Sequence, residues 1–257
     1  MKAVHRILDP ATAGQVPVGL CALGIMTKAP RAGEVKTRLT PPLTSEEAAT
    51  LNACFLRDLA GSIATACTTA PAHGVGVYTP LGAEAAYETI LPPDFFLIPQ
   101  RGDTFGERLI LAAENLFNAG FESVCLINSD SPTVPASSFA EAVNKLSGSG
   151  NRVVLGPSDD GGYYLIGLKQ MHHRLFEEID WSTERVLAQT LKRAAEIGVE
   201  VHQLPSGFDV DDRASLRRLC DELLGVKTGS ASDVAPNARK FLSDIVEREG
   251  RDRIWSS

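Results

Sequence analysis

Short apolar runs alternate with amphipathic helical patterns along most of this sequence, and this alternation limits the folds that the chain can adopt. Such a pattern predicts a mostly parallel sheet with helices on both faces. Ligands bind such sheets beyond the carboxyl ends of the strands. The predicted strands are residues 18–26, 74–78, 95–98, 123–127, 152–155, 163–168 and 200–204; one helix begins at Thr44, and others cover 105–117, 138–146, 183–197 and 212–224.

Local signals mark the ends of several of these helices. Thr44 and Glu47 have the spacing of a capping box, and apolar residues follow them at helical intervals. Ser182 or Thr183 is the expected cap of the helix 183–197. Gly225 follows the final helix, where a glycine suits a left-handed C-cap.

Length, charge and hydropathy restrict the class of protein. The 257 residues suffice for one large α/β domain. A net charge of −7 without a long basic run argues against nucleic-acid binding. No apolar run approaches the roughly 18 residues of a membrane span, and the start of the chain lacks the apolar core of a secretory signal. The 5 cysteines are scattered and form no C-x-x-C pair. We therefore expect a cytoplasmic protein with no nucleic-acid or membrane partner.

Composition divides the chain into three parts. We expect an N-terminal extension at 1–17, the α/β domain at 18–225, and a linker with a helical extension at 226–257. Gly, Ser, Ala and Thr dominate 226–233, as is typical of a linker. Residues 238–249 predict a helix that packs on the domain or on a second subunit, which leaves a homo-oligomer open.

A basic loop follows the first predicted strand. It contains Lys28, Gly33, Lys36 and Arg38, and Gly33 can adopt positive φ. A bent loop at a strand end exposes backbone N–H groups that suit a phosphate, and Lys and Arg side chains add positive charge. The spacing matches neither a Walker A loop nor G-x-G-x-x-G. Two interpretations stay open, a phosphate-binding loop and a solvated basic loop.

Acidic residues follow two other predicted strands. Asp130 comes shortly after the strand 123–127, and Asp211 precedes the final helix. A hard cation such as Mg²⁺ prefers carboxylate oxygens, water and substrate phosphates. Asp209 and Asp211 would share one side of an extended segment, where a divalent ion between them would offset their repulsion. The alternatives are an Asx-turn at Asp130 and helix capping at Asp211 or Asp212.

The segment Asp160-Gly161-Gly162 lies between two strand-like runs. Asp-Gly and Gly-Gly are typical of a tight hairpin turn. Two glycines also let the backbone approach a ligand closely. The two interpretations are compatible, and we keep both.

Several segments occur in a characteristic order along the chain. They are Lys28-Ala-Pro, Gly33-Glu-Val-Lys36-Thr-Arg38-Leu, Gln100-Arg-Gly, Gly106-Glu-Arg108, Asp130-Ser-Pro132, Asp160-Gly-Gly-Tyr163, Trp181-Ser-Thr183 and Asp209-Val-Asp211. In this order they resemble the DUF2064 family of GT-A-fold transferases, some of which are labelled arsenosugar-biosynthesis glycosyltransferases. The resemblance covers residues 20–224 and implies a GT-A, Rossmann-like nucleotide-diphospho-sugar transferase fold.

The wider GT-A group includes molybdenum-cofactor and phospholactate guanylyltransferases. Similarity to them implies that Lys36 and Arg38 bind a triphosphate, and that Asp130 and Asp211 hold Mg²⁺ or Mn²⁺. The sequence departs from the family pattern in three places. Asn-Ser-Asp-Ser-Pro stands where the family often has Gly-Thr-Asp-Cys-Pro, and no Thr-Pro follows the second carboxylate. The Leu-x-Gly-Gly start of many nucleotidyltransferases is also absent. The predicted nucleotide contacts are Lys28, Gly33, Lys36, Arg38, Gly161 and Gly162.

Three functions are compatible with these residues. The first is nucleotidyl transfer from an NTP to a phosphorylated or phosphonylated small acceptor, in which Lys36 and Arg38 stabilise the leaving pyrophosphate. It is favoured by the basic loop, because a triphosphate needs more cations than an NDP-sugar. The alternative is glycosyl transfer from an NDP-sugar to a small acceptor, with Asp160 as general base. The third is a non-catalytic nucleotide-binding protein.

Overall fold

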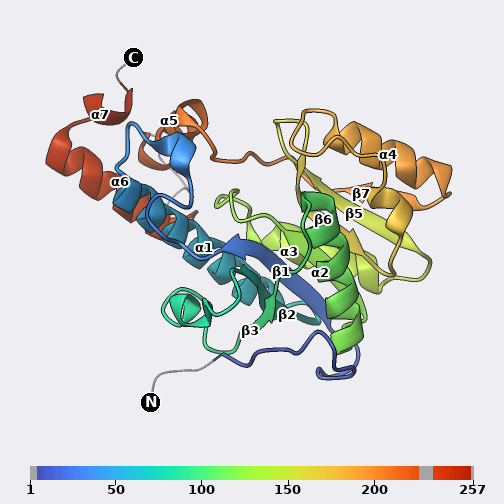
Figure 1. The fold of residues 1–257 in the computed structure, drawn as a ribbon. Helices are drawn as coiled ribbons and strands as arrows, with labels where there is room; N and C mark the ends of the chain where they lie inside the picture. Colours follow the sequence, from blue (N-terminus) through green and yellow to red (C-terminus); the bar gives the residue numbers. More distant parts are fainter. Residues whose placement is uncertain (1–4, 226–233, 256–257) are drawn as a thin grey trace.

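The computed structural model describes residues 5–225 and 234–255, and within them a seven-stranded sheet forms the centre of the fold (Figure 1). The strand order is β3-β2-β1-β4-β6-β5-β7. Neighbouring strands are parallel except at β6, which is antiparallel to β4 and β5. The predicted mostly parallel sheet is therefore confirmed. The strands are β1 (Cys21–Lys28), β2 (Ala72–Thr79), β3 (Phe96–Pro99), β4 (Ser123–Ile127), β5 (Arg152–Pro157), β6 (Tyr163–Leu168) and β7 (Glu200–Gln203).

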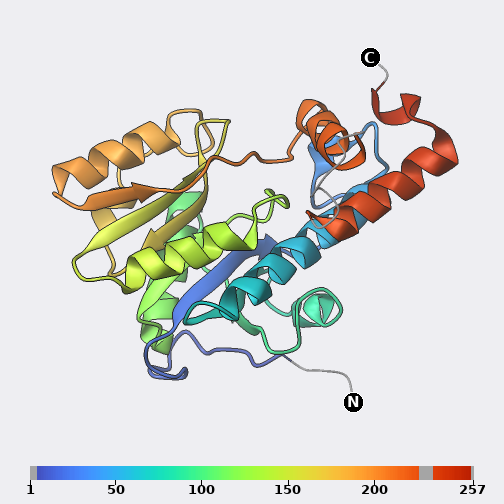
Figure 2. The same ribbon diagram turned by 180° about the vertical axis from the view of Figure 1, so that it is seen from behind.

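Helices cover both faces of the sheet, as predicted. The apolar sides of α1 (Ser45–Cys67) and α3 (Ala136–Ser147) pack on one face (Figure 2). The other face is covered by α2 (Phe105–Ala119) and α4 (Val186–Glu196) (Figure 1). Both layers are built from side chains at helical spacing, which bury one stripe of each helix against the strands. No helix in the described residues is long and apolar enough to cross a membrane.

Helix ends confirm some sequence signals and correct others. The capping box of Thr44 and Glu47 is present at α1, and Asp212 caps α5 (Arg213–Leu224). The predicted left-handed C-cap at Gly225 was wrong, because this residue is extended with φ −68°. The predicted cap at Ser182 or Thr183 was also wrong. The chain stays in a loop there and α4 begins at Val186.

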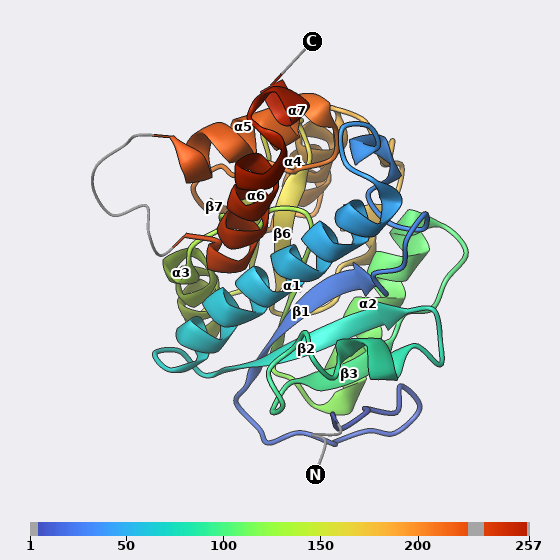
Figure 3. The same cartoon turned by 90° about the vertical axis from the view of Figure 1, so that its left-hand side faces the viewer.

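A third apolar cluster lies beyond the sheet, where α1 meets the C-terminal helices α6 (Pro236–Glu249) and α7 (Asp252–Trp255) and also α5. Figure 3 shows α6 lying alongside α1. The structure thus forms the predicted terminal helix, packed on the domain. The predicted linker at 226–233 lies outside the described residues. The boundaries at 17 and 225 stay predictions; within the first segment, Ile7 pairs with Leu97 at the edge of the sheet.

Asp58 of α1 provides the N-terminal cap of α6 from far away in the chain. Its carboxylate accepts hydrogen bonds from the backbone N–H groups of Asn237 and Ala238, each at 2.9 Å. Ala235, at the N-cap position itself, makes no capping side-chain bond. Asp58 is buried, with 5% of its surface exposed. The cap therefore satisfies one buried and one half-buried backbone donor at the start of α6.

Replacing Asp58 by alanine should lower the free energy of unfolding by about 2 kcal/mol, because the N–H groups of Asn237 and Ala238 lose their acceptor. Urea denaturation measures this change. Asp244→Ala is the matched control, because Asp244 lies on the exposed side of α6 and pairs with Lys240 there. That control should cost less than about 0.5 kcal/mol. Equal losses in both variants would contradict the capping role.

Candidate active site

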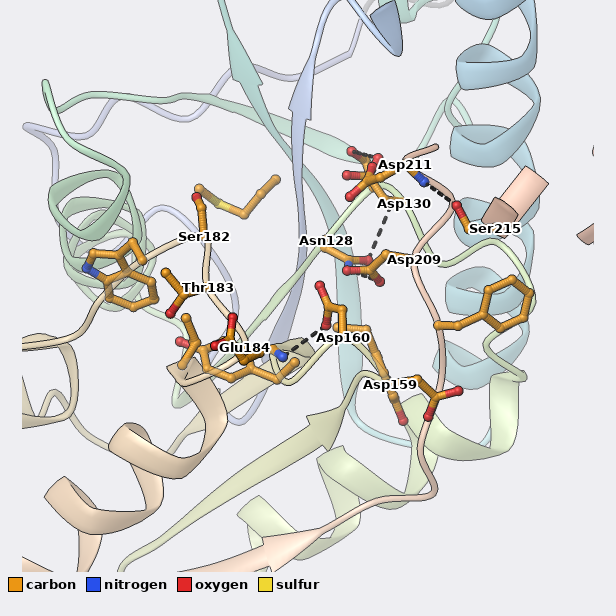
Figure 4. A pocket seen from close by; sticks show the side chains of 18 of the residues that line it. Asn128, Asp130, Asp159, Asp160, Ser182, Thr183, Glu184, Asp209, Asp211 and Ser215 are labelled. Atoms are coloured by element: carbon orange, nitrogen blue, oxygen red, sulfur yellow. Dashed lines mark hydrogen bonds between the residues drawn. The ribbon is translucent and has the colours of Figure 1, made fainter. Parts of the chain in front are cut away.

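A cavity of about 910 Å³ opens where β1 and β4 end, the position at which parallel sheets bind ligands (Figure 4). Its walls come from the ends of these strands, the β5–β6 turn, the loop 181–184 and the segment 208–215. Val210 N donates a hydrogen bond to the carbonyl oxygen of Asp130 at 2.9 Å, which holds the loop after β4 against that segment. Side chains distant in sequence therefore meet in one pocket.

Lys36 joins the two predicted metal ligands. Its ammonium nitrogen lies 2.6 Å from Asp130 Oδ1 and 2.9 Å from Asp211 Oδ1, and it donates to the Val210 carbonyl at 2.8 Å. Only 5% of the side chain is exposed. Burial alone would lower the pKa of Lys36, but the two carboxylates outweigh that effect and raise it. Lys36 is thus a buried, charged partner of Asp130 and Asp211.

The other residues of the basic loop divide into two groups. Arg38 lines the cavity. Lys28 is turned to its own loop, where it pairs with Glu34 at 3.5 Å, and neither Lys28 nor Gly33 contributes to the cavity lining. The positive φ expected of Gly33 is confirmed at 75°. The contacts of Lys28 and Gly33 with a nucleotide stay predictions.

Asp209 is held apart from Asp211. Asn128 Nδ2 donates to Asp209 Oδ1 at 2.7 Å, and Ser131 Oγ donates to the same oxygen. Burial raises the pKa of Asp209 to about 6, and the hydrogen bonds only partly offset it. The cation expected between Asp209 and Asp211 stays a prediction; within the described residues, Asp211 instead shares the Lys36 ammonium with Asp130.

The hairpin predicted at Asp160-Gly161-Gly162 is confirmed as the β5–β6 turn. Asp160 Oδ1 accepts a hydrogen bond from Gly162 N at 2.9 Å, and the side chain lies between Glu184 and Asp209 in the cavity (Figure 4). Gly161 has φ 86°, and a Cβ there would lie 2.2 Å from the carbonyl oxygen of Glu184. Gly162 lines the cavity and Gly161 does not. The absence of a side chain at Gly161 therefore lets the backbone of the loop 181–184 approach closely. The sequence had predicted close approach of a nucleotide at this glycine.

Phe105 and Trp181 form an aromatic wall of the cavity, and this wall was not predicted. The two rings meet edge to face with centroids 5.4 Å apart. Phe105 is 52% exposed, which is unusual for a large apolar side chain beside a pocket. A Cβ at Gly106 would lie 2.5 Å from Trp181 Nε1. Gly106 and Trp181 both belong to segments that carried the family resemblance. Their joint presence was the signal in the sequence that could have revealed this wall.

The carboxylates of Asp130 and Asp211 fit a divalent metal. Their side chains are 31% and 46% exposed, so oxygen atoms remain accessible from the cavity. Across the described residues, no group of three or more His, Cys, Asp or Glu side chains has the arrangement of a closed metal site. Mg²⁺ and its analogues need only one or two carboxylates, because water and substrate phosphates supply the other ligands. The donor set therefore suits a metal that arrives with a nucleotide.

Comparison with known proteins supports the fold and the family resemblance. Residues 63–183 match the model of DUF2064, described as an uncharacterized protein conserved in bacteria. A comparison with curated proteins found no match.

Two solved structures are similar over most of the chain. One is a protein from Desulfovibrio desulfuricans G20 that is proposed to be a nucleotide-diphospho-sugar transferase. It is 28% identical in sequence and has a TM-score of 0.77. The match covers 91% of this chain and 99% of that one. The other is a cytidylyltransferase from Leptospira borgpetersenii, 10% identical with a TM-score of 0.50, covering 94% and 98%. The second likeness shows the fold alone, and the first agrees with the prediction of a transferase enzyme. The resemblance predicted from the motifs is therefore confirmed: residues 63–183 match the DUF2064 model, and the fold is that of nucleotide-diphospho-sugar transferases.

Proposed function

We propose that this chain is a metal-dependent glycosyltransferase that uses an NDP-sugar and a small acceptor. The observation that carries the proposal is the withdrawal of Lys28 and Lys36 from the cavity. Of the two cations that line the described pocket, Arg218 is held by Asp159 at 2.8 Å, so Arg38 is the one available to a phosphate. A triphosphate with departing pyrophosphate needs more positive charge than this. This arrangement weakens the argument from the basic loop that favoured nucleotidyl transfer, and so it supports the alternative.

The proposed roles follow the two halves of the cavity. Arg38, Asp130 and Asp211 would face the diphosphate of the donor. When bound to the two carboxylates, a divalent metal would neutralise the charge that develops on the departing nucleoside diphosphate. The aromatic wall would contact the apolar face of a sugar ring.

The charge of the acceptor follows from the same geometry. Asp160 and Glu184 both line the same cavity as Asp130, Asp211 and the aromatic wall. Their negative charges would repel a phosphorylated or phosphonylated acceptor. A hydroxyl acceptor needs a base to remove its proton, and Asp160 is suitably placed for that role. The proposed acceptor is therefore an uncharged hydroxyl compound.

Product analysis distinguishes the three functions. Purified protein with Mg²⁺ or Mn²⁺ would be given each common NDP-sugar and each NTP, with and without an extract of small metabolites. Acceptor-dependent release of a nucleoside diphosphate from one NDP-sugar is the expected result. Acceptor-dependent pyrophosphate from an NTP would replace the proposal with nucleotidyl transfer. Nucleotide binding without either product would indicate the non-catalytic alternative.

Asp160→Asn should lower kcat about 100-fold with little change in donor affinity, because the amide cannot accept the acceptor's proton. Steady-state kinetics and donor titration measure the two effects separately. Asp159→Asn is the matched control. Asp159 is the adjacent carboxylate in the same turn, and it is engaged by Arg218 and Ser206. Sugar transfer at the normal rate by the Asp160 variant would exclude the base role.

A further inference from the structure

Lys36 is directed inward by the backbone of its own loop. It has φ 49° and ψ 34°, a left-handed conformation that costs a non-glycine residue roughly 1–2 kcal/mol. The flanking residues Val35 and Leu39 are both buried, so the loop is anchored on either side of it. The ammonium also lies 5.6 Å from the centre of the Phe55 ring. A side chain held in this way is not free to follow a ligand as a solvated lysine would.

The contacts of Lys36 occupy one oxygen of each predicted metal ligand. The ammonium binds Oδ1 of Asp130 and Oδ1 of Asp211, at 2.6 and 2.9 Å. Its third partner is the Val210 carbonyl, so all three N–H donors have an acceptor. Without this cation the two carboxylates would repel each other across the same space. The structure therefore contains its own positive charge at the point where a metal would bind.

We propose that Lys36 is a positioning residue that holds Asp130 and Asp211 together and, by its charge, limits their affinity for a divalent metal. The inference rests on the proposed function in one respect, the assignment of these two carboxylates as metal ligands. It differs from the role first predicted for Lys36, which was direct contact with phosphate.

Charge repulsion gives the sign of the effect. A divalent ion bound to Asp130 and Asp211 would lie within a few ångströms of the Lys36 ammonium, and like charges this close repel even at the dielectric constant of water. Removing the ammonium should therefore tighten metal binding, whereas a residue that only supported the fold would weaken it when removed. A residue that bound phosphate alone would leave the affinity for the free metal unchanged.

The test is a titration of the full chain with Mn²⁺ alone. The electron paramagnetic resonance signal of the free ion measures how much Mn²⁺ stays unbound. Lys36→Met should bind Mn²⁺ about tenfold more tightly than the wild type. Lys36→Arg keeps the charge and should stay within about threefold of the wild type. Arg38→Met removes a cation of the same loop that is exposed to solvent, and it should also change the affinity by less than about threefold.

Two further measurements keep the outcomes separate. Circular dichroism establishes that each variant is folded, and Lys36→Gln replaces the Met variant if that one does not fold. Asp130→Asn locates the metal: if it binds Mn²⁺ as well as the wild type does, the metal assignment of the proposed function is wrong and the inference falls with it. If Asp130→Asn loses Mn²⁺ binding but Lys36→Met binds no more tightly than the wild type, the inference alone is overturned.

Discussion

Replacing Asp130 by asparagine is expected to reduce kcat about 1000-fold or more while the protein remains folded. The amide has nearly the shape of the carboxylate, and Ser129 Oγ, 3.1 Å from Oδ1, can still bond to the oxygen of the amide. The negative charge is lost, however, and with it a ligand that a hard divalent cation requires. Loss of several kcal/mol of transition-state stabilisation by a metal corresponds to a rate loss of this size.

The control for this prediction is Asp212→Asn. Asp212 also lines the cavity, but its side chain caps α5 by accepting a hydrogen bond from Ser215 N at 2.9 Å. Asparagine caps a helix about as well as aspartate does. Activity in this variant should therefore stay within a few fold of the wild type. Activity of the Asp130 variant within tenfold of the wild type would show that Asp130 does not bind an essential metal.

Gly161→Ala should lower the free energy of unfolding by about 3 kcal/mol and should also abolish most activity. The methyl group would meet the Glu184 carbonyl oxygen at 2.2 Å, a contact that only a backbone shift can relieve. Leu187 N also donates to the Gly161 carbonyl at 2.9 Å, so the shift would reach the start of α4. The displaced loop 181–184 forms one wall of the cavity.

Gly150→Ala separates the two causes of this loss. Gly150 has the same positive φ of 86°, but a Cβ there has no neighbour within 4 Å. Its substitution should cost only the backbone strain, about 1 kcal/mol. Chemical denaturation of both variants gives the difference, which measures the close approach of Glu184. Equal stabilities would mean that the loop moves aside without cost.

The layers of the fold could be predicted because apolar periodicity reports local burial. Strand positions, the capping box at Thr44 and the hairpin at Asp160 all depend on residues close in sequence. The start of α4 could not be predicted from its local signals. Ser182 and Thr183 have the chemistry of caps, but the contact of Glu184 with Gly161 keeps that segment in a loop.

The site was predictable in place but less so in its contacts. Because strand ends meet at one edge of a parallel sheet, Asp130, Asp211 and the basic loop were expected to converge; Lys36 contacts both carboxylates, whereas Lys28 lies apart from the cavity. The partner of Lys36 could not be predicted, because Asp211 is 175 residues away and the direction of the lysine depends on an unusual backbone conformation. Phe105 and Trp181 were missed for a similar reason, since they are 76 residues apart and neither has a local signal for a cavity wall.

The capping of α6 by Asp58 has a consequence for synthesis of the chain on the ribosome. Asn237 is 179 residues from Asp58, so about 10 to 35 seconds separate their synthesis at rates of roughly 5–20 residues per second. During that interval Leu51 and Phe55 of α1 lack part of the apolar surface that later covers them. A nascent chain in which α1 has already formed would therefore expose apolar surface that α6 later covers, and exposed surface of this kind favours aggregation.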